Sequence, residues 1–148
     1  MRGLSLWKGK VTVEDLNKRC ENTLVQHLGI EFTEIGDDYI KGMMPVDHRT
    51  VQPAGILHGG ASLVLAESLG SVAGFMCIDR EKQYCVGMEI NANHIRPVRS
   101  GRVYGVVKPI HIGRKTHVWE ISISNQNGKL ICVSRITLAI LNKDEKVC

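Results

Sequence analysis

Phenylalanine and clustered basic residues are both scarce in this sequence. Only two phenylalanines occur, and no stretch holds five or six lysines or arginines in a row. Proteins that bind single-stranded nucleic acid stack bases on aromatic side chains inside basic grooves. The net charge of +4 is too weak by itself to indicate a nucleic-acid partner. We expect no nucleic-acid binding, whereas a small polyanion such as a nucleotide-bearing molecule is compatible with this charge.

Paired cysteines are also absent. The five cysteines, at positions 20, 77, 85, 132 and 148, are odd in number and never have CxxC spacing, so they indicate neither a disulfide framework nor a zinc knuckle. His111 and His117 have no clear third ligand, so no metal is expected. Residues 1–10 lack the apolar stretch and cleavage site of a signal peptide. We expect a cytoplasmic protein with reduced cysteines.

One long apolar run, Leu57–Ile78, is the most unusual feature that the sequence does have. It is long enough to cross a bilayer, and Gly70 and Gly74 have the spacing of paired membrane helices. However, the run also contains Glu67, a histidine, three serines and four glycines. Amphipathic strands follow it. We therefore predict a helix at the centre of a single domain that spans residues 1–148, and no membrane association.

The rest of the chain divides into short helices and strands. The segment 1–29 is expected to hold two short helices, the first capped by Thr12 and Asp15 and the second by Asn22. Alternating apolar residues predict strands at 30–35, 39–46, 84–96, 101–112, 117–125 and 129–141. Asn127-Gly128 predicts a hairpin turn, because both residues tolerate a positive φ, and residues 142–148 are expected to fray. The expected fold is α+β, an antiparallel sheet wrapped around one long central helix.

Glu67 is the most informative single residue. It is the only charged side chain between Arg49 and Asp79, and aliphatic residues surround it in the sequence. Burying an unpaired carboxylate costs several kcal/mol or shifts its pKa strongly, so we expect a partner or a substrate to use it. The alternative is a salt bridge or water at the edge of the core. Ser71 falls on the same helical face, where it either orients the carboxylate or a water, or is only a small packing residue.

The segment that precedes the helix is rich in glycine. Gly59 lies in the first helical turn, where backbone N–H groups are unpaired and the helix dipole is positive. Such a group is suited to stabilise a developing oxyanion. Gln52 could bind a carbonyl or a water, and His58 could do the same or simply cap the helix.

The spacing of these residues has a consequence for assembly. Gly59 and Glu67 are eight residues apart, which places them ~12 Å from each other along one helix. They cannot both touch one small acyl carbonyl. An antiparallel copy of the helix from a second subunit would bring its Glu67 beside this Gly59. We therefore expect a homodimer with shared active sites.

Two segments carry a family resemblance. The run from Gln52 to Ser71 and the run from Val86 to Pro97 resemble the hotdog-fold thioesterases of the PaaI-like type, and the resemblance covers roughly residues 5–141. Two branches are most similar, the 1,4-dihydroxy-2-naphthoyl-CoA thioesterases of menaquinone biosynthesis and the proofreading thioesterases of enterobactin synthesis. Val72 and the segment Asn91–His94 favour the first branch.

The resemblance implies roles for the candidate residues. It makes Glu67 the nucleophile or the general base, and Gly59 the donor that polarises the thioester carbonyl. Gln52 and His58 help to position that carbonyl, and Ser71 orients the water or the carboxylate. The implied contacts to the substrate or its coenzyme A part are His94, Arg96, Val72, Gly113 and Arg114.

The implied substrate is an acyl-CoA, with aromatic acyl groups expected first. Coenzyme A is then part of the substrate, and no cofactor is needed. The resemblance also implies a tetramer built from two dimers. A solvated surface charge is the alternative for each of the two arginines. Other possible functions are a hydroxyacyl-thioester dehydratase, a non-catalytic acyl-CoA sensor and a purely structural oligomer.

Overall fold

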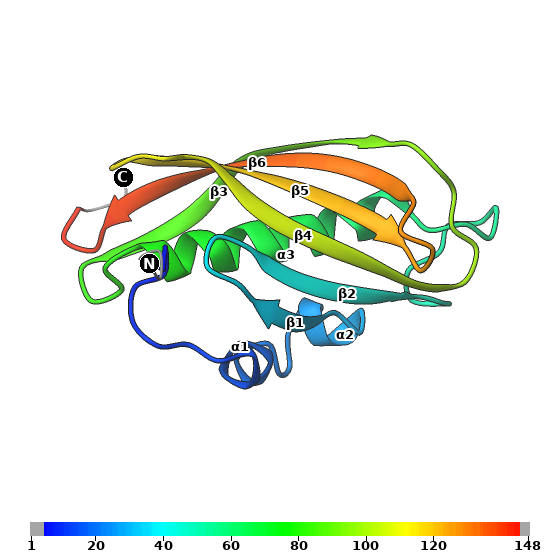
Figure 1. The fold of residues 1–148 in the computed structure, drawn as a ribbon, viewed down its shortest axis with the longest axis horizontal. Coiled ribbons are helices and arrows are strands. Elements are labelled where there is room, and N and C mark those ends of the chain that lie inside the picture. The colour runs from blue at the N-terminus through cyan, green and yellow to red at the C-terminus, as the bar shows by residue number, and fades with distance from the viewer. Residues whose placement is uncertain (1–4, 146–148) are drawn as a thin grey trace.

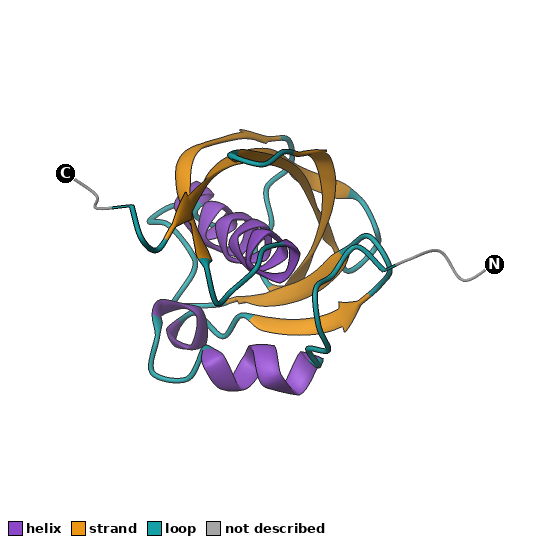
Figure 2. Ribbon diagram, turned by 90° about the vertical axis from the view of Figure 1, so that its left-hand side faces the viewer, coloured by secondary structure: helices purple, strands orange, loops and turns teal. Residues whose placement is uncertain are grey.

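The structure, a computed structural model, describes residues 5–145. Six antiparallel strands form one sheet in the order β1-β2-β4-β5-β6-β3, and this sheet curves around the long helix α3 (Figures 1 and 2). The predicted hotdog architecture is therefore confirmed. The helices are α1 (Val13–Arg19), α2 (Leu24–His27) and α3 (Gly59–Cys77). The strands are β1 (Glu31–Ile35), β2 (Ile40–Val46), β3 (Gln83–His94), β4 (Gly101–Ile112), β5 (Thr116–Asn125) and β6 (Leu130–Asn142).

The core lies between the concave face of the sheet and one side of α3. Leu65 and Leu69 of the helix are fully buried, as are Trp119 and Ile136 of the sheet. Removing such apolar surface from water is the main stabilising contribution to the fold. The helix is long and apolar enough to cross a membrane, with a mean hydropathy of 1.4, but 56% of its apolar stretch is buried inside the fold. Its apolar character is that of a core helix.

The two glycines of α3 permit close packing against β6. A Cβ atom at Gly70 would lie 2.5 Å from Cγ2 of Ile136, and one at Gly74 would collide with the Leu138 side chain. The spacing that resembles a membrane pairing motif thus has a different cause, because the two missing side chains let the helix approach the sheet.

The N-terminal helices follow their capping signals only in part. The predicted capping box of α1 is present, since Thr12 and Asp15 bond reciprocally to each other's backbone N–H groups. The prediction that Asn22 caps α2 is wrong. Thr23 is the N-cap residue, while Asn22 adopts a positive φ of 60° in the turn before it and its N–H donates to the Gln26 side chain.

The predicted hairpin turn at Asn127-Gly128 is confirmed, since it joins the antiparallel strands β5 and β6. Of the two residues only Gly128 adopts a positive φ, of 74°, because the Asn125 side chain accepts from the N–H groups of Asn127 and Lys129 and fixes a longer turn. The expected frayed tail begins too early. Asn142 still belongs to β6, and Lys143 donates its N–H to Lys82 and its Nζ to Arg80. Residues 146–148 lie outside the described part of the chain.

Candidate active site

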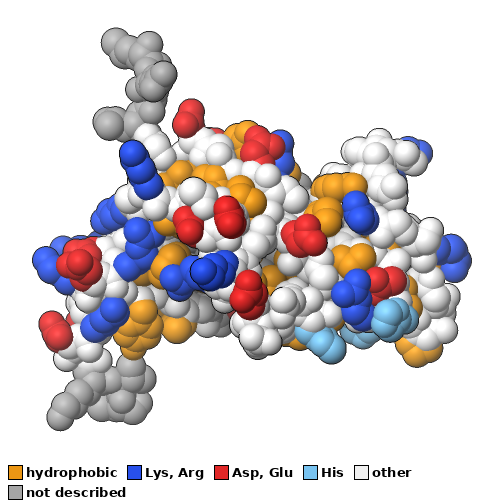
Figure 3. All heavy atoms as spheres, turned by 90° about the horizontal axis from the view of Figure 1, so that it is seen from below, with side chains coloured by type: hydrophobic (Ala, Val, Ile, Leu, Met, Phe, Trp, Pro, Cys, Tyr) orange, Lys and Arg blue, Asp and Glu red, His pale blue; other side chains and the backbone are white. Residues whose placement is uncertain are grey.

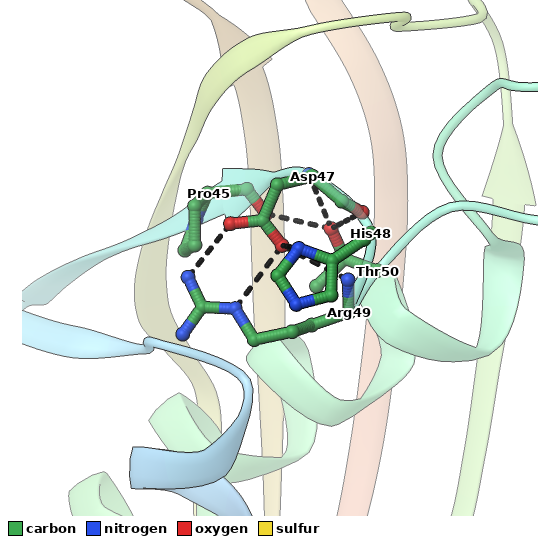
Figure 4. A network of polar contacts seen from close by, with 5 residues as sticks. All are labelled: Pro45, Asp47, His48, Arg49 and Thr50. Atoms are coloured by element: carbon green, nitrogen blue, oxygen red, sulfur yellow. Dashed lines mark hydrogen bonds and ion pairs between the residues drawn. The ribbon is translucent and has the colours of Figure 1, made fainter.

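The loop that leads into α3 is held by an ion pair and a buried threonine (Figure 4). Arg49 donates from Nη2 and Nε to the Asp47 carboxylate, at 2.7 and 3.1 Å, and this contact lowers the pKa of Asp47 to about 2. Thr50 is only 1% exposed and donates its hydroxyl to the Pro45 carbonyl. The Thr50 carbonyl in turn accepts from the N–H of His58 at 2.8 Å. The loop therefore fixes where α3 begins.

The first turn of α3 leaves one backbone donor free. His58 is the N-cap residue, and its Nδ1 accepts from the N–H of Gly60 at 2.8 Å. Ala61 and Ser62 both donate to the His58 carbonyl. Among residues 5–145 no acceptor meets the N–H of Gly59. The capping interaction also fixes the His58 tautomer, because an accepting Nδ1 leaves the proton on Nε2, as a donor.

Several predicted residues meet in one cavity beside Gly59, which we call the Gly59 cavity. It has a volume of about 470 Å³, and its lining includes Gln52, Gly59, His94 and Arg96. The His94 ring lies directly against Gly59, since a Cβ there would be 2.8 Å from Nε2 of His94. The Gln52 Oε1 accepts from the N–H of Ala54, which leaves the Gln52 amide N–H groups as donors.

Arg96 is tied to the neighbouring strand. Its Nη1 donates to the Leu130 carbonyl at 2.6 Å, so the guanidinium is held at the rim of the Gly59 cavity with its other N–H groups available. A positive charge at this position is placed to meet an anionic group that approaches from solvent.

Glu67 lies farther along α3 and is exposed in the protomer. The protomer alone therefore does not desolvate this carboxylate. The sheet covers only one side of the helix, and Glu67 belongs to the uncovered side, together with the half-buried Leu63, Val64 and Ser71. Its Oε1 lies over the backbone of Gly87, where a Cβ would come within 2.7 Å. No described Lys, Arg or His forms an ion pair with it.

Ser71 and Val72 line a second cavity, which we call the Phe75 cavity. It has a volume of about 360 Å³ and lies between the outer side of α3 and β3, with Phe75, Tyr84 and Cys85 also in its lining. The Ser71 hydroxyl shares the Glu67 face but makes no hydrogen bond to Glu67 within residues 5–145.

Gly113 and Arg114 are not near the other predicted residues in the protomer. They line a cavity beside Cys77 and Ile78, at the C-terminal end of α3, whereas the Gly59 cavity is at its N-terminal end. Across residues 5–145 no three His, Cys, Asp or Glu side chains gather in a group that could hold a metal ion.

Sequence reasoning did not single out Gly87, Phe75 or Tyr84. A glycine inside a strand often marks a close approach by another group, and β3 has a register shift between Gly87 and Glu89. The glycine inside the predicted strand 84–96 could therefore have identified Gly87 from the sequence. Phe75 and Tyr84 gave no comparable signal, because their position beside α3 depends on how β3 packs against the helix.

Known proteins resemble this chain over most of its length. Residues 54–132 match the thioesterase superfamily. The 1,4-dihydroxy-2-naphthoyl-CoA hydrolase of Escherichia coli is 56% identical, over 92% of this chain and 99% of that protein. The proofreading thioesterase EntH of Cronobacter turicensis is 50% identical, over 92% and 98%. A crystal structure of a thioesterase from Haemophilus influenzae superposes with a TM-score of 0.92 at 52% identity and covers 97% of this chain and 99% of its own. With a family match over more than half its length and relatives of this identity, the chain is a thioester hydrolase that belongs to the thioesterase superfamily.

Proposed function

We propose that this enzyme hydrolyses aromatic acyl-CoA thioesters to the free acid and coenzyme A, with 1,4-dihydroxy-2-naphthoyl-CoA as the leading candidate substrate. The similar E. coli protein bears the name of that activity. The observation that carries the proposal is that α3 bears two groups without partners in the protomer, the N–H of Gly59 and the carboxylate of Glu67. One group suits the carbonyl oxygen of a thioester and the other suits attack on its carbon.

The two groups act on one bond only if two subunits combine. The side of α3 that bears Glu67 is uncovered, and β3 is an edge strand of the sheet. Val86 and Met88 on β3 are 42% and 65% exposed. Long apolar edge strands are templates for pairing with another chain. We infer a homodimer in which β3 pairs with its own copy, so that the two α3 helices lie antiparallel.

The inferred two-fold axis can be described on both α3 and β3. Gly59 lies against His94, and Glu67 lies against Gly87. An axis that brings Glu67 to the partner's Gly59 passes near Leu63 on the helix. On β3 it passes midway between positions 87 and 94, so Gly87 would face the partner's His94. The Phe75 cavity of one subunit would then adjoin the Gly59 cavity of the other.

The proposed chemistry uses these groups in sequence. The Gly59 N–H binds the carbonyl oxygen and stabilises its negative charge as the carbon is attacked. Glu67 of the other subunit either attacks the carbon itself or takes a proton from the attacking water. The C–S bond breaks, coenzyme A leaves as the thiol, and the carboxylic acid remains. Gln52 and the Nε2–H of His58 position the carbonyl, and Ser71 holds the water or the carboxylate.

The nucleotide end of the substrate needs cationic contacts outside the cleft. His94 and Arg96 are available at the rim of the Gly59 cavity. In the inferred dimer the partner's α3 continues past Gly59, so the partner's Gly113 and Arg114 lie at the same end of the cleft. We propose that both groups contact coenzyme A and that no separate cofactor takes part. A tetramer built from two such dimers is a further expectation.

A proofreading activity on aryl groups bound to a carrier protein is the second candidate, because the Cronobacter relative bears that name. The kcat/KM of the purified enzyme should be compared across aryl, short-chain and long-chain acyl-CoAs, and with an aryl-loaded carrier protein. Adding a 3-hydroxyacyl-CoA to the screen tests for dehydration, which would leave the thioester intact and release no thiol.

Glu67→Ala tests the mechanism directly. Because Glu67 is exposed in the protomer, this variant should fold. We expect hydrolysis of benzoyl-CoA to fall ~10³-fold or more while acyl-CoA binding is largely kept, as measured by thiol release and by calorimetric titration. Glu120→Ala removes an exposed carboxylate from β5, away from the inferred dimer contact, and is the matched control. Comparable turnover in the Glu67→Ala enzyme would remove Glu67 from the mechanism and favour a binding protein.

A further inference from the structure

Three cationic side chains converge on the Phe75 cavity, and among residues 5–145 no acidic side chain lines it. They come from separate parts of the chain: Arg19 from α1, Arg80 from the turn after α3, and Lys143 from the segment after β6. Figure 3 shows Lys and Arg side chains at this end of the molecule, interspersed with Asp and Glu, whereas the histidines visible in this view lie at the other end. Like charges held together without counter-charges repel one another, so this end of the cavity attracts an anion.

Phe75 brings two of these charges together. The guanidinium carbon of Arg19 lies 4.3 Å from the centre of the Phe75 ring, and that of Arg80 lies 5.1 Å from it. Neither arginine forms an ion pair with any described carboxylate. Arg80 donates from Nη2 to the Lys8 carbonyl, while its Nη1 is shielded from solvent and has no acceptor among the described residues. A shielded cationic donor without an acceptor is costly.

The Phe75 cavity lies on the same side of α3 as Glu67. Its apolar walls include Val72 and Phe75 on α3 and Tyr84 on β3. Ser71, one helical turn from Glu67, also lines it. Glu67 and Phe75 are two turns apart, or ~12 Å along the helix axis. An acyl group whose carbonyl is held at Glu67 could therefore lie along this wall and bring its far end to the arginines.

We propose that the Phe75 cavity binds the distal half of the acyl group and that Arg19 and Arg80 select acyl groups with an anionic oxygen at that end, a carboxylate or an ionised phenol. The inference rests on the proposed acyl-CoA hydrolysis and adds a substrate class to it. Phe75, Val72 and Tyr84 contact the apolar body of the acyl group, and the two guanidiniums contact its charged end.

Matched pairs of substrates test this selection. The kcat/KM of the wild-type enzyme is measured for octanoyl-CoA against suberoyl-CoA and for 4-methylbenzoyl-CoA against 4-carboxybenzoyl-CoA, since each pair differs only in the distal carboxylate. We expect at least one carboxylate-bearing member to be favoured by about tenfold, the size of one good charge-assisted hydrogen bond.

In the variants Arg19→Gln and Arg19→Gln/Arg80→Gln, the ratio of kcat/KM for the carboxylate-bearing substrate to that for its uncharged partner should fall toward one. The kcat/KM for the uncharged substrates should change little. Lys18→Gln is the matched control, because it removes a neighbouring charge from the last turn of the same helix but does not line the cavity. An unaltered preference in the arginine variants, or a wild-type preference for the uncharged member of both pairs, overturns the inference while leaving the hydrolase intact. Failure to hydrolyse any of the four thioesters would overturn the proposed function and, with it, this inference.

Discussion

Glu67 shows how the meaning of a residue depends on what surrounds it. In the sequence it is a lone charge in an apolar run, which suggests a buried acid. In the protomer it is exposed and lies over the Gly87 backbone. The inferred dimer would cover it again, but with a partner's helix instead of the core of its own chain. In the protomer the exposed carboxylate has little desolvation cost. The inferred dimer could still use it for catalysis.

His117 is a second residue whose charge state is set by its position. It is only 2% exposed, its Nδ1 has no partner within the described residues, and burial lowers its pKa below the ordinary value of 6.5. Above that value both the folded and the unfolded chain hold a neutral imidazole. As the pH falls below about 6.5, the unfolded chain binds a proton that the folded chain disfavours, so stability is lost toward acid.

We therefore expect His117→Phe, which keeps an aromatic ring against Trp119, to lose less stability than the wild type between pH 7 and pH 5. Urea unfolding at a series of pH values measures this difference. Identical pH profiles for the two proteins would show that His117 does not contribute to acid sensitivity.

At the scale of elements, α3 has two different sides. One packs into the concave sheet through Leu65 and Leu69, and glycines at 70 and 74 bring it close to β6. The other side carries the candidate acid and the wall of the Phe75 cavity. Because both sides are largely apolar, the helix has almost no amphipathic pattern, and its orientation is set by small residues more than by hydrophobicity.

Gly70→Ala separates helix propensity from packing. Alanine favours the helix by about 1 kcal/mol over glycine, but the new Cβ would lie 2.5 Å from the stiff, β-branched Ile136. Overpacking of this kind costs about 1–3 kcal/mol. We expect a net loss in the free energy of unfolding, measured by urea denaturation. Ser68→Ala, on the uncovered side of the same helix, should cost less, and a Gly70→Ala protein at least as stable as that control would contradict the packing argument.

At the scale of the whole molecule, the protomer holds two half-sites at different levels of one helix. The Gly59 cavity has the donors and the Glu67 region has the acid. In the proposed homodimer a two-fold axis would join them in pairs, so that each active site would be made by two chains.

Subunit mixing tests this sharing. Glu67→Ala and Gln52→Ala/His58→Ala subunits, each expected to be nearly inactive alone, are co-expressed with different tags and the mixed dimer is purified. Half of its sites then have every group intact, so about half of the wild-type activity should return. Activity no higher than the mean of the two parent variants would place all the groups of one site in a single chain.

The sequence by itself determined the order of the elements, the α1 capping box and the central apolar helix. These depend on neighbours a few residues apart, whose spacing is visible in the chain. It also supplied Gln52, His58, Gly59 and Glu67 as candidates. Asn22 was assigned the wrong local role, because Thr23 is the N-cap of α2 and the N–H of Asn22 donates to the Gln26 side chain.

Only the tertiary structure decided that Glu67 faces outward, that Gly113 and Arg114 lie far from Gly59, and that Arg19, Arg80 and Lys143 share one cavity. These residues are distant in the chain, and sheet topology and curvature bring them together or separate them. Hydrophobic periodicity reports whether a residue faces a core, but it does not say which side of an evenly apolar helix that core occupies.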